Sequence, residues 1–139
     1  MSLIVLLGAC TTISTDDEGV LTPVDSQRFD SLLALNDLNE RAFEYHQFCL
    51  KDTEPMSAVF MDNYKLVANM LYDETVETIG WEPEFIVRQV LERRQKIQNL
   101  LNRHYRTEGC QSQEAMTARA HYLGLSQVGD NYIQGLITP

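Results

Sequence analysis

Histidines, cysteines and methionines are the side chains of this 139-residue sequence that metal or redox chemistry would use. A zinc or di-iron site on helices is marked by His-Glu-x-x-His or by paired Glu-x-x-His motifs, and the sequence contains neither. The sequence also lacks the Cys-x-x-Cys-His run that attaches haem covalently. Side chains that could ligate a non-covalent haem are His46, His104, Met56 and Met70. Methionines at helical spacing are typical of core packing, so we predict neither a metal nor a cofactor.

Carboxylates four residues apart are the remaining candidates for acid and base chemistry. Glu40 with Glu44, and Asp73 with Glu77, have this spacing. The same spacing is ordinary on the solvent face of a helix in an acidic protein. No adjacent Ser, Cys or His completes a nucleophilic arrangement, and no Gly-rich phosphate loop is present. We therefore expect no catalytic residues and predict that the protein is not an enzyme.

Basic side chains gather in one stretch of the second half of the chain. Fourteen acids and four bases lie in residues 1–80, whereas six acids and seven bases lie in residues 81–139. The two halves therefore attract each other, and the net charge of −9 disfavours nucleic-acid binding. The candidate partner or anion surface consists of Arg88, Arg93, Arg94, Lys96, Arg103 and Arg106. The alternative is a solvated helix face whose cations pair with acidic neighbours.

Four long segments must position these side chains, and each repeats its apolar residues at steps of three and four. None shows the alternation of a strand. Three short connections, near 52–54, 80–82 and 109–111, force sequential helices antiparallel. The sequence therefore predicts an all-α fold, an up-down-up-down four-helix bundle in a single domain over residues 25–139. The predicted helices span about 25–51, 53–79, 82–108 and 112–136.

The start of the chain has the pattern of a processing segment rather than of a folded element. A short apolar run, Leu3 to Leu7, ends in small residues followed by Cys10. Leu7-Gly8-Ala9-Cys10 resembles the lipobox of bacterial lipoproteins, although no Lys or Arg precedes the apolar run. The resemblance implies that residues 1–9 are a signal segment and that Cys10 becomes the lipid-modified N-terminus. Thr11 in place of an aspartate implies sorting to the outer membrane, with the protein facing the periplasm.

Residues 10–24 are rich in Thr, Ser, Asp and Glu and have few apolar groups. Such a segment buries too little surface to offset the entropy lost on ordering the chain. We therefore predict that it is a flexible tether between the lipid and the helical domain.

Two cysteines remain once Cys10 is assigned to the lipid. Cys49 lies at the end of the first predicted helix, and Cys110 lies just after the third. In an up-down-up-down bundle these ends share one pole, where the Cα atoms can approach within the roughly 5.5–6 Å of a disulfide. An exported protein also meets an oxidising compartment. We predict a Cys49–Cys110 disulfide; the alternative is two independent buried thiols.

Anchor, tether and bundle without a catalytic constellation favour a protein that binds another protein of the cell envelope. The layout is similar to that of the helical secretin pilotins of type II secretion. These are small outer-membrane lipoproteins whose disulfide-bearing helical bundle binds a short helix of the secretin subunit. The sequence carries no pilotin signature, so no binding residues transfer. The alternative function is a carrier that holds a small ligand, a lipid or haem, within the bundle.

Overall fold

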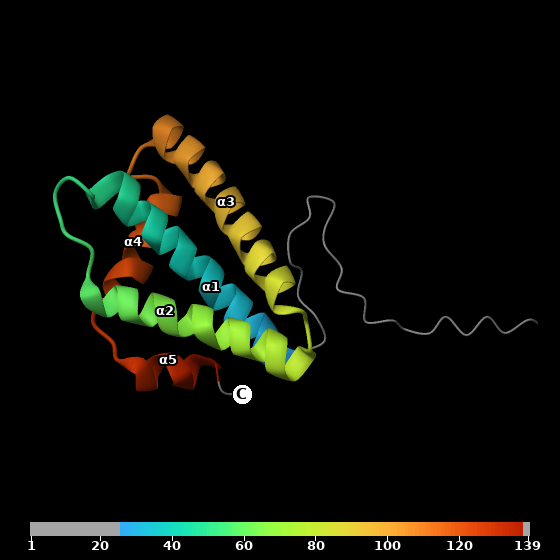
Figure 1. Ribbon diagram of the computed structural model, residues 1–139. Coiled ribbons are helices and arrows are strands. Elements are labelled where there is room, and N and C mark those ends of the chain that lie inside the picture. The colour runs from blue at the N-terminus through green and yellow to red at the C-terminus, as the bar shows by residue number, and fades with distance from the viewer. Residues whose placement is uncertain (1–25, 138–139) are drawn as a thin grey trace, which may run out of the picture.

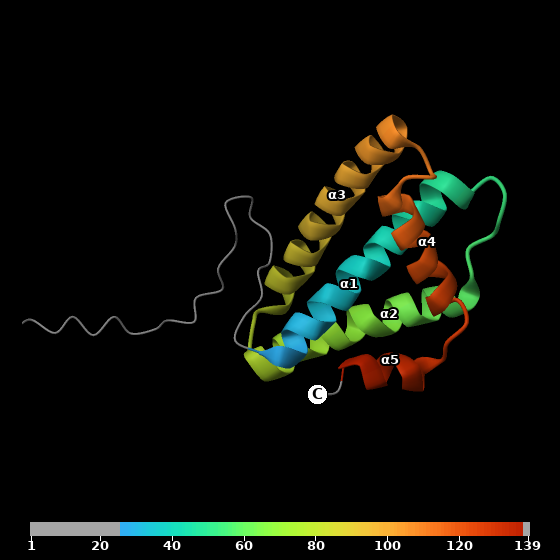
Figure 2. The same cartoon turned by 180° about the vertical axis from the view of Figure 1, so that it is seen from behind.

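The described part of the chain is built around one central helix. The computed structural model describes residues 26–137, and Figures 1 and 2 show its helices from opposite sides. No strand occurs among these residues, in agreement with the predicted all-α class. The elements in chain order are α1 (Gln27–Tyr45), the π-helical turn η1 (His46–Leu50), α2 (Ala58–Asp73), the π-helical turn η2 (Glu74–Ile79), α3 (Pro83–Glu108), α4 (Gln113–Leu125) and α5 (Asp130–Ile137).

Helix α1 is covered by its neighbours on several sides. Its N-cap is Ser26, whose hydroxyl accepts a hydrogen bond from the backbone N–H of Phe29 at 3.1 Å. Helices α2, α3 and α4 all pack against α1. The buried face is therefore wider than the stripe of a surface helix, and it includes polar side chains. The buried residues of α1 are Phe29, Leu32, Leu33, Leu35, Asn36, Asn39, Glu40, Ala42, Glu44 and Tyr45.

Helices α1, α2 and α3 come together at one corner of the molecule and diverge from it (Figures 1 and 2). Gly80 ends η2 there with φ 86°, a left-handed conformation that glycine adopts without strain. The next residue, Trp81, is buried, and its ring packs edge-on against Phe29 and Phe85 with centroid distances of 5.4 and 5.7 Å. Trp81 thus holds the beginning of α1 against the beginning of α3.

The predicted fourth helix is two helices, so the expected count of four is corrected to five α-helices in residues 26–137. The break lies between Leu125, where α4 ends, and Asp130, where α5 begins. Asn63 of α2 donates its side-chain amide to the carbonyls of Leu125 and Val128 at 2.9 and 2.8 Å. These bonds satisfy carbonyls that a continuous helix would have paired with its own backbone. The chain can therefore turn after α4 and lay α5 beside α2 (Figure 2).

Most of the core lies between α1, α2, α4 and α5, and a second cluster lies where α1 meets α3 and α4. Ile133 and Ile137 of α5 are buried in the first cluster. The second cluster contains Tyr45, Ile97, Leu101, Tyr105, Ala115 and Ala118. No helix within residues 26–137 is both long and apolar enough to cross a membrane.

Candidate functional site

Cys10, the signal segment 1–9 and the tether 10–24 all lie outside the described residues. The predicted sites within residues 26–137 are the cysteine pair and the six cations of α3.

The cysteine pair is joined as the sequence predicts. Cys49 and Cys110 form a disulfide with their Cα atoms 6.0 Å apart. Cys49 lies in η1 and Cys110 in the connection between α3 and α4, so the bond ties two distant parts of the chain. Tyr45 and Tyr105 pack edge to face close to it, with ring centroids 6.3 Å apart. Burial raises the pKa of Tyr105 to about 12.

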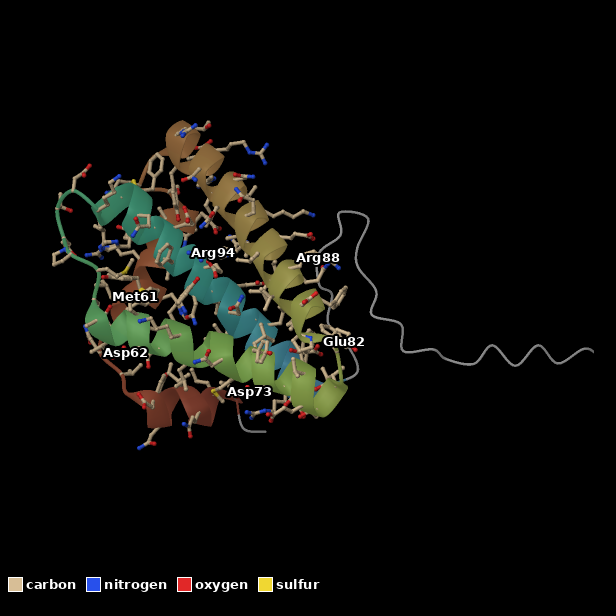
Figure 3. The ribbon with its side chains drawn as sticks, viewed as in Figure 1. Met61, Asp62, Asp73, Glu82, Arg88 and Arg94 are labelled. Atoms are coloured by element: carbon tan, nitrogen blue, oxygen red, sulfur yellow. A yellow bond between two sulfur atoms is a disulfide. The ribbon has the colours of Figure 1, made fainter. Side chains whose placement is uncertain are left out.

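Two of the six cations face α1 rather than a partner. Arg93 donates two hydrogen bonds to Asp37, from Nε to Oδ1 and from Nη2 to Oδ2, each at 2.6 Å. Arg94 Nε lies 3.3 Å from Glu40 Oε2, close enough for an ion pair but not aligned as a hydrogen bond. Its guanidinium also lies over the Phe43 ring, 5.1 Å from the centroid, and Figure 3 shows it against α1. These pairs hold α3 onto α1, as the opposite charges of the two halves predict.

Glu40 and Glu44 are buried between the helices. Glu40 is only 2% exposed, and Tyr64 Oη of α2 donates a hydrogen bond to its Oε1 at 2.6 Å. Burial raises the pKa of Glu40, although the hydrogen bond from Tyr64 and the charge of Arg94 oppose this shift. Burial also raises the pKa of Glu44, against a hydrogen bond from Gln98 and the charge of Arg94. This group of side chains links α1, α2 and α3.

The prediction that Glu40 and Glu44 lie on the solvent face of their helix is wrong. Both are buried because α2, α3 and α4 cover α1. Asp73 and Glu77, the other pair considered, are exposed on α2 and η2. Neither Glu40 nor Glu44 lines any of the surface hollows described below. The buried carboxylates lie between α1, α2 and α3, where Glu40 contacts Tyr64 and Arg94. Tyr64 and Asn63 were missed by the sequence analysis, because a polar residue on an amphipathic helix gives no sign of which neighbour it meets.

The other four cations are mostly exposed to solvent. Arg88, Arg103 and Arg106 are exposed, and Lys96 is half-buried. Arg88 projects from the outer side of α3 (Figure 3), and its guanidinium lies 5.9 Å from the centroid of the Phe85 ring. Arg103 Nε donates to the backbone carbonyl of Asn99 at 3.3 Å. The predicted cationic surface is thus divided between internal pairs and outward cations.

The histidines each have a separate polar contact. His46 Nε2 lies 2.9 Å from the carbonyl of Glu54, and His104 Nε2 lies 2.9 Å from Ser112 Oγ. His121 Nε2 lies 3.1 Å from Asn39 Oδ1, and burial lowers the pKa of its imidazole. Within residues 26–137, no three His, Cys, Asp or Glu side chains gather in a group that could hold a metal ion.

One apolar surface lies where α2 and α3 diverge. A hollow of about 220 Å³ runs between the two helices there. Tyr72, Val87 and Leu91 are its exposed large apolar side chains, and the outward side of α3 continues the surface. We call this the α2–α3 face; its hollow is lined by Ala68, Asn69, Tyr72, Ile86, Val87, Val90 and Leu91.

A second apolar surface lies between α4 and α5. A hollow of about 180 Å³ separates them, with Tyr132 and Leu136 exposed on its α5 side. On the α4 side, few side-chain atoms project into the groove, because Ala120 has a small side chain and Gly124 has none. A Cβ atom added at Gly124 would meet no atom within 4 Å. We call this the α4–α5 groove; it is lined by Ala120, His121, Gly124, Leu125, Val128, Tyr132 and Leu136.

Comparison of the chain with models of protein families, with curated proteins and with solved structures finds no match.

Proposed function

We propose that this protein is a lipoprotein of the bacterial outer membrane that works by binding another envelope protein. Cys10 carries the lipid, residues 10–24 form the tether, and the helical domain faces the periplasm and recognises the partner. This arrangement is similar in layout to that of the helical secretin pilotins. The Cys49–Cys110 disulfide supports the proposal, since such bonds persist in oxidising compartments such as the periplasm.

The α4–α5 groove is the structural feature that best supports a binding function. Tyr132 and Leu136 are exposed on one side of the groove, and Ala120 and Gly124 present little side chain on the other. The backbone of an incoming helix can therefore approach α4 closely. Aromatic side chains next to a hollow are also the common anchors of protein interfaces. We propose that the groove receives one apolar face of a partner's amphipathic helix. The net charge of −9 favours a partner segment that is basic outside its apolar face.

Membrane fractionation of cells that express the full chain tests the anchor. We expect the wild-type protein in the outer-membrane fraction and the Cys10→Ala variant in the soluble periplasmic fraction, because a single acylated residue supplies the attachment. Ser14→Ala is the matched control, since it changes a residue of the proposed tether without touching the lipobox or the disulfide. Equal membrane association of Cys10→Ala and the wild type would contradict the lipoprotein proposal.

Site-specific photocrosslinking in the intact envelope tests the groove. A photoreactive amino acid at position 132 should give one discrete protein adduct, and the same probe at Asp62, which is exposed on α2, should not. Gly124→Leu should abolish the adduct by filling the groove, whereas Gly124→Ala should retain it. Identical adducts at both probe positions would contradict the proposal. A lipid or haem retained by the protein in native mass spectrometry, without any adduct, would favour the carrier function instead.

A further inference from the structure

The α2–α3 face exposes large apolar side chains that the helices of residues 26–137 leave uncovered. Val87 is 49% exposed and Leu91 is 57% exposed, and they lie one turn apart on α3. Tyr72 of α2 adds a third exposed apolar side chain beside them. A contiguous apolar surface of this kind, bordered by charges, marks an interaction site on a soluble protein domain.

The charges that border this face alternate in sign. Glu84, Arg88 and Glu92 follow one another at intervals of four residues, and all three are exposed. They line the shallow hollow on the outer side of α3 together with Pro83, Val87 and Leu91. A strongly acidic or strongly basic partner would meet a like charge somewhere along this row. A row of acid, base and acid can instead pair with a reversed copy of itself that is displaced by one step, because each arginine then lies beside a glutamate of the other copy.

A twofold axis perpendicular to α3 relates two copies of this helix that run in opposite directions. When two copies of α3 pack antiparallel, residues on one flank of a helix lie opposite the same flank of the other helix. A register that places Val87 beside Leu91 of a second copy also brings Arg88 within reach of Glu92 of that copy. The twofold axis repeats each contact, so the interface holds two ion pairs around one apolar centre.

The overall charge distribution also favours this face for self-association. Two copies with a net charge of −9 repel each other, and the repulsion is strongest where acids concentrate. Residues 1–80 hold most of the acids, whereas residues 81–139, which include α3, have one more base than acid. Contact centred on α3 therefore keeps most of the acids of residues 1–80 out of the interface, with Asp73, beside Tyr72, at its edge.

We propose that the protein forms a homodimer through the α2–α3 face, with α3 of one copy antiparallel to α3 of the other. This surface shares no lining residue with the α4–α5 groove. The homodimer can therefore be tested separately from the interaction with the partner protein.

Sedimentation equilibrium of the full chain over a range of concentrations tests the dimer. We expect a mass that rises from 15.9 kDa toward twice that value with concentration. Leu91→Arg should weaken dimerisation by at least about tenfold, because it places a charge in the apolar centre. Leu100→Arg is the matched control: Leu100 is 49% exposed on α3 but lies in a different hollow, beside Lys96 and Arg103. A single monomeric species up to about 100 µM, or equal effects of the two variants, would overturn the proposal.

A charge exchange tests the antiparallel register. Arg88→Glu gives copies with acids at both 88 and 92, and Glu92→Arg gives copies with bases at both positions. Each variant alone should dimerise at least about tenfold more weakly than the wild type, whereas an equimolar mixture should form a heterodimer. Circular dichroism melting of each variant checks that the monomer remains folded. Failure of the mixture to associate, while the wild type dimerises, would overturn the antiparallel pairing.

Discussion

The side-chain amide of Asn63 donates a hydrogen bond to the backbone carbonyl of Leu125, 62 positions further along the chain, with Nδ2 and the carbonyl oxygen 2.9 Å apart. The same amide nitrogen donates to the carbonyl of Val128 at 2.8 Å. Through these two bonds a buried residue of α2 fixes the point at which α4 ends. The position of α5, and with it the α4–α5 groove, follows from this contact.

Replacing Asn63 by leucine should lower the free energy of unfolding by about 2–4 kcal/mol, because one buried and one partly buried carbonyl lose their donor. Urea unfolding followed by circular dichroism measures the change. Lys65→Leu is the control, since Lys65 is exposed on the same helix and lines neither proposed surface, so its replacement should change stability by less than about 0.5 kcal/mol. Equal effects of the two variants would contradict the structural role of Asn63.

Removing the disulfide should destabilise the protein through the unfolded state. The bond closes a loop with a sequence separation of 61, for which the chain-entropy model gives about 4 kcal/mol. We expect the double variant Cys49→Ala/Cys110→Ala to lose roughly this free energy in urea unfolding under non-reducing conditions. The oxidised wild type should also be about 2 Da lighter than its reduced form. Labelling of both thiols in the native, non-reduced protein would contradict the bond.

Mildly acidic solution should stabilise the fold through Glu40 and Glu44. Their pKa values in the folded protein are raised above the ordinary value of 4.5, so the folded state binds more protons than the unfolded chain. Their contribution is therefore fully present below pH 4.5 and is lost as the pH rises through the raised values. Unfolding measured from pH 4 to 8 should show a flatter dependence in Glu40→Gln/Glu44→Gln. The exposed Glu77→Gln should leave the profile unchanged.

Two tyrosine-to-phenylalanine variants should differ in stability, because one tyrosine hydroxyl donates a hydrogen bond and the other is buried without a hydrogen-bond partner. Tyr64→Phe removes the donor to the buried Glu40 and should cost about 1–3 kcal/mol of stability. Tyr105 Oη is buried without a hydrogen-bond partner, so Tyr105→Phe should be neutral or stabilising by up to about 1 kcal/mol. Thermal unfolding of the two variants at neutral pH compares them. A larger loss from Tyr105→Phe than from Tyr64→Phe would contradict both assignments.

Two alanine variants should change stability in opposite directions. Gly124 lies inside α4 with open space around it, so Gly124→Ala should stabilise the helix by about 0.5–1 kcal/mol. Gly80 has φ 86°, and Gly80→Ala should destabilise by about 1–2 kcal/mol because alanine is strained in that conformation. Chemical denaturation of both variants provides the measurement. Stabilisation by Gly80→Ala would contradict the left-handed end of η2.

Local features of the sequence predicted the helices well. Apolar residues at steps of three and four, with caps such as Ser26 and Ser112, are enough to place α1, α3 and α4, whereas α2 begins at Ala58 rather than near residue 53. The disulfide was also predictable, because Cys49 and Cys110 lie at helix ends that the short connections bring together. Helix periodicity and loop length act over a few residues, so they can be read directly from the chain.

The helical fold, the disulfide and the attraction between two oppositely charged halves could be predicted from local patterns in the sequence. The folded structure was needed to show that the fourth segment breaks, that Glu40 is buried beside Tyr64, and that Arg93 and Arg94 turn inward while Arg88 turns outward. This difference arises because periodicity identifies only the apolar side of a helix. The partner that a polar side chain meets is set by residues far away in the chain, as Asn63 meets Leu125.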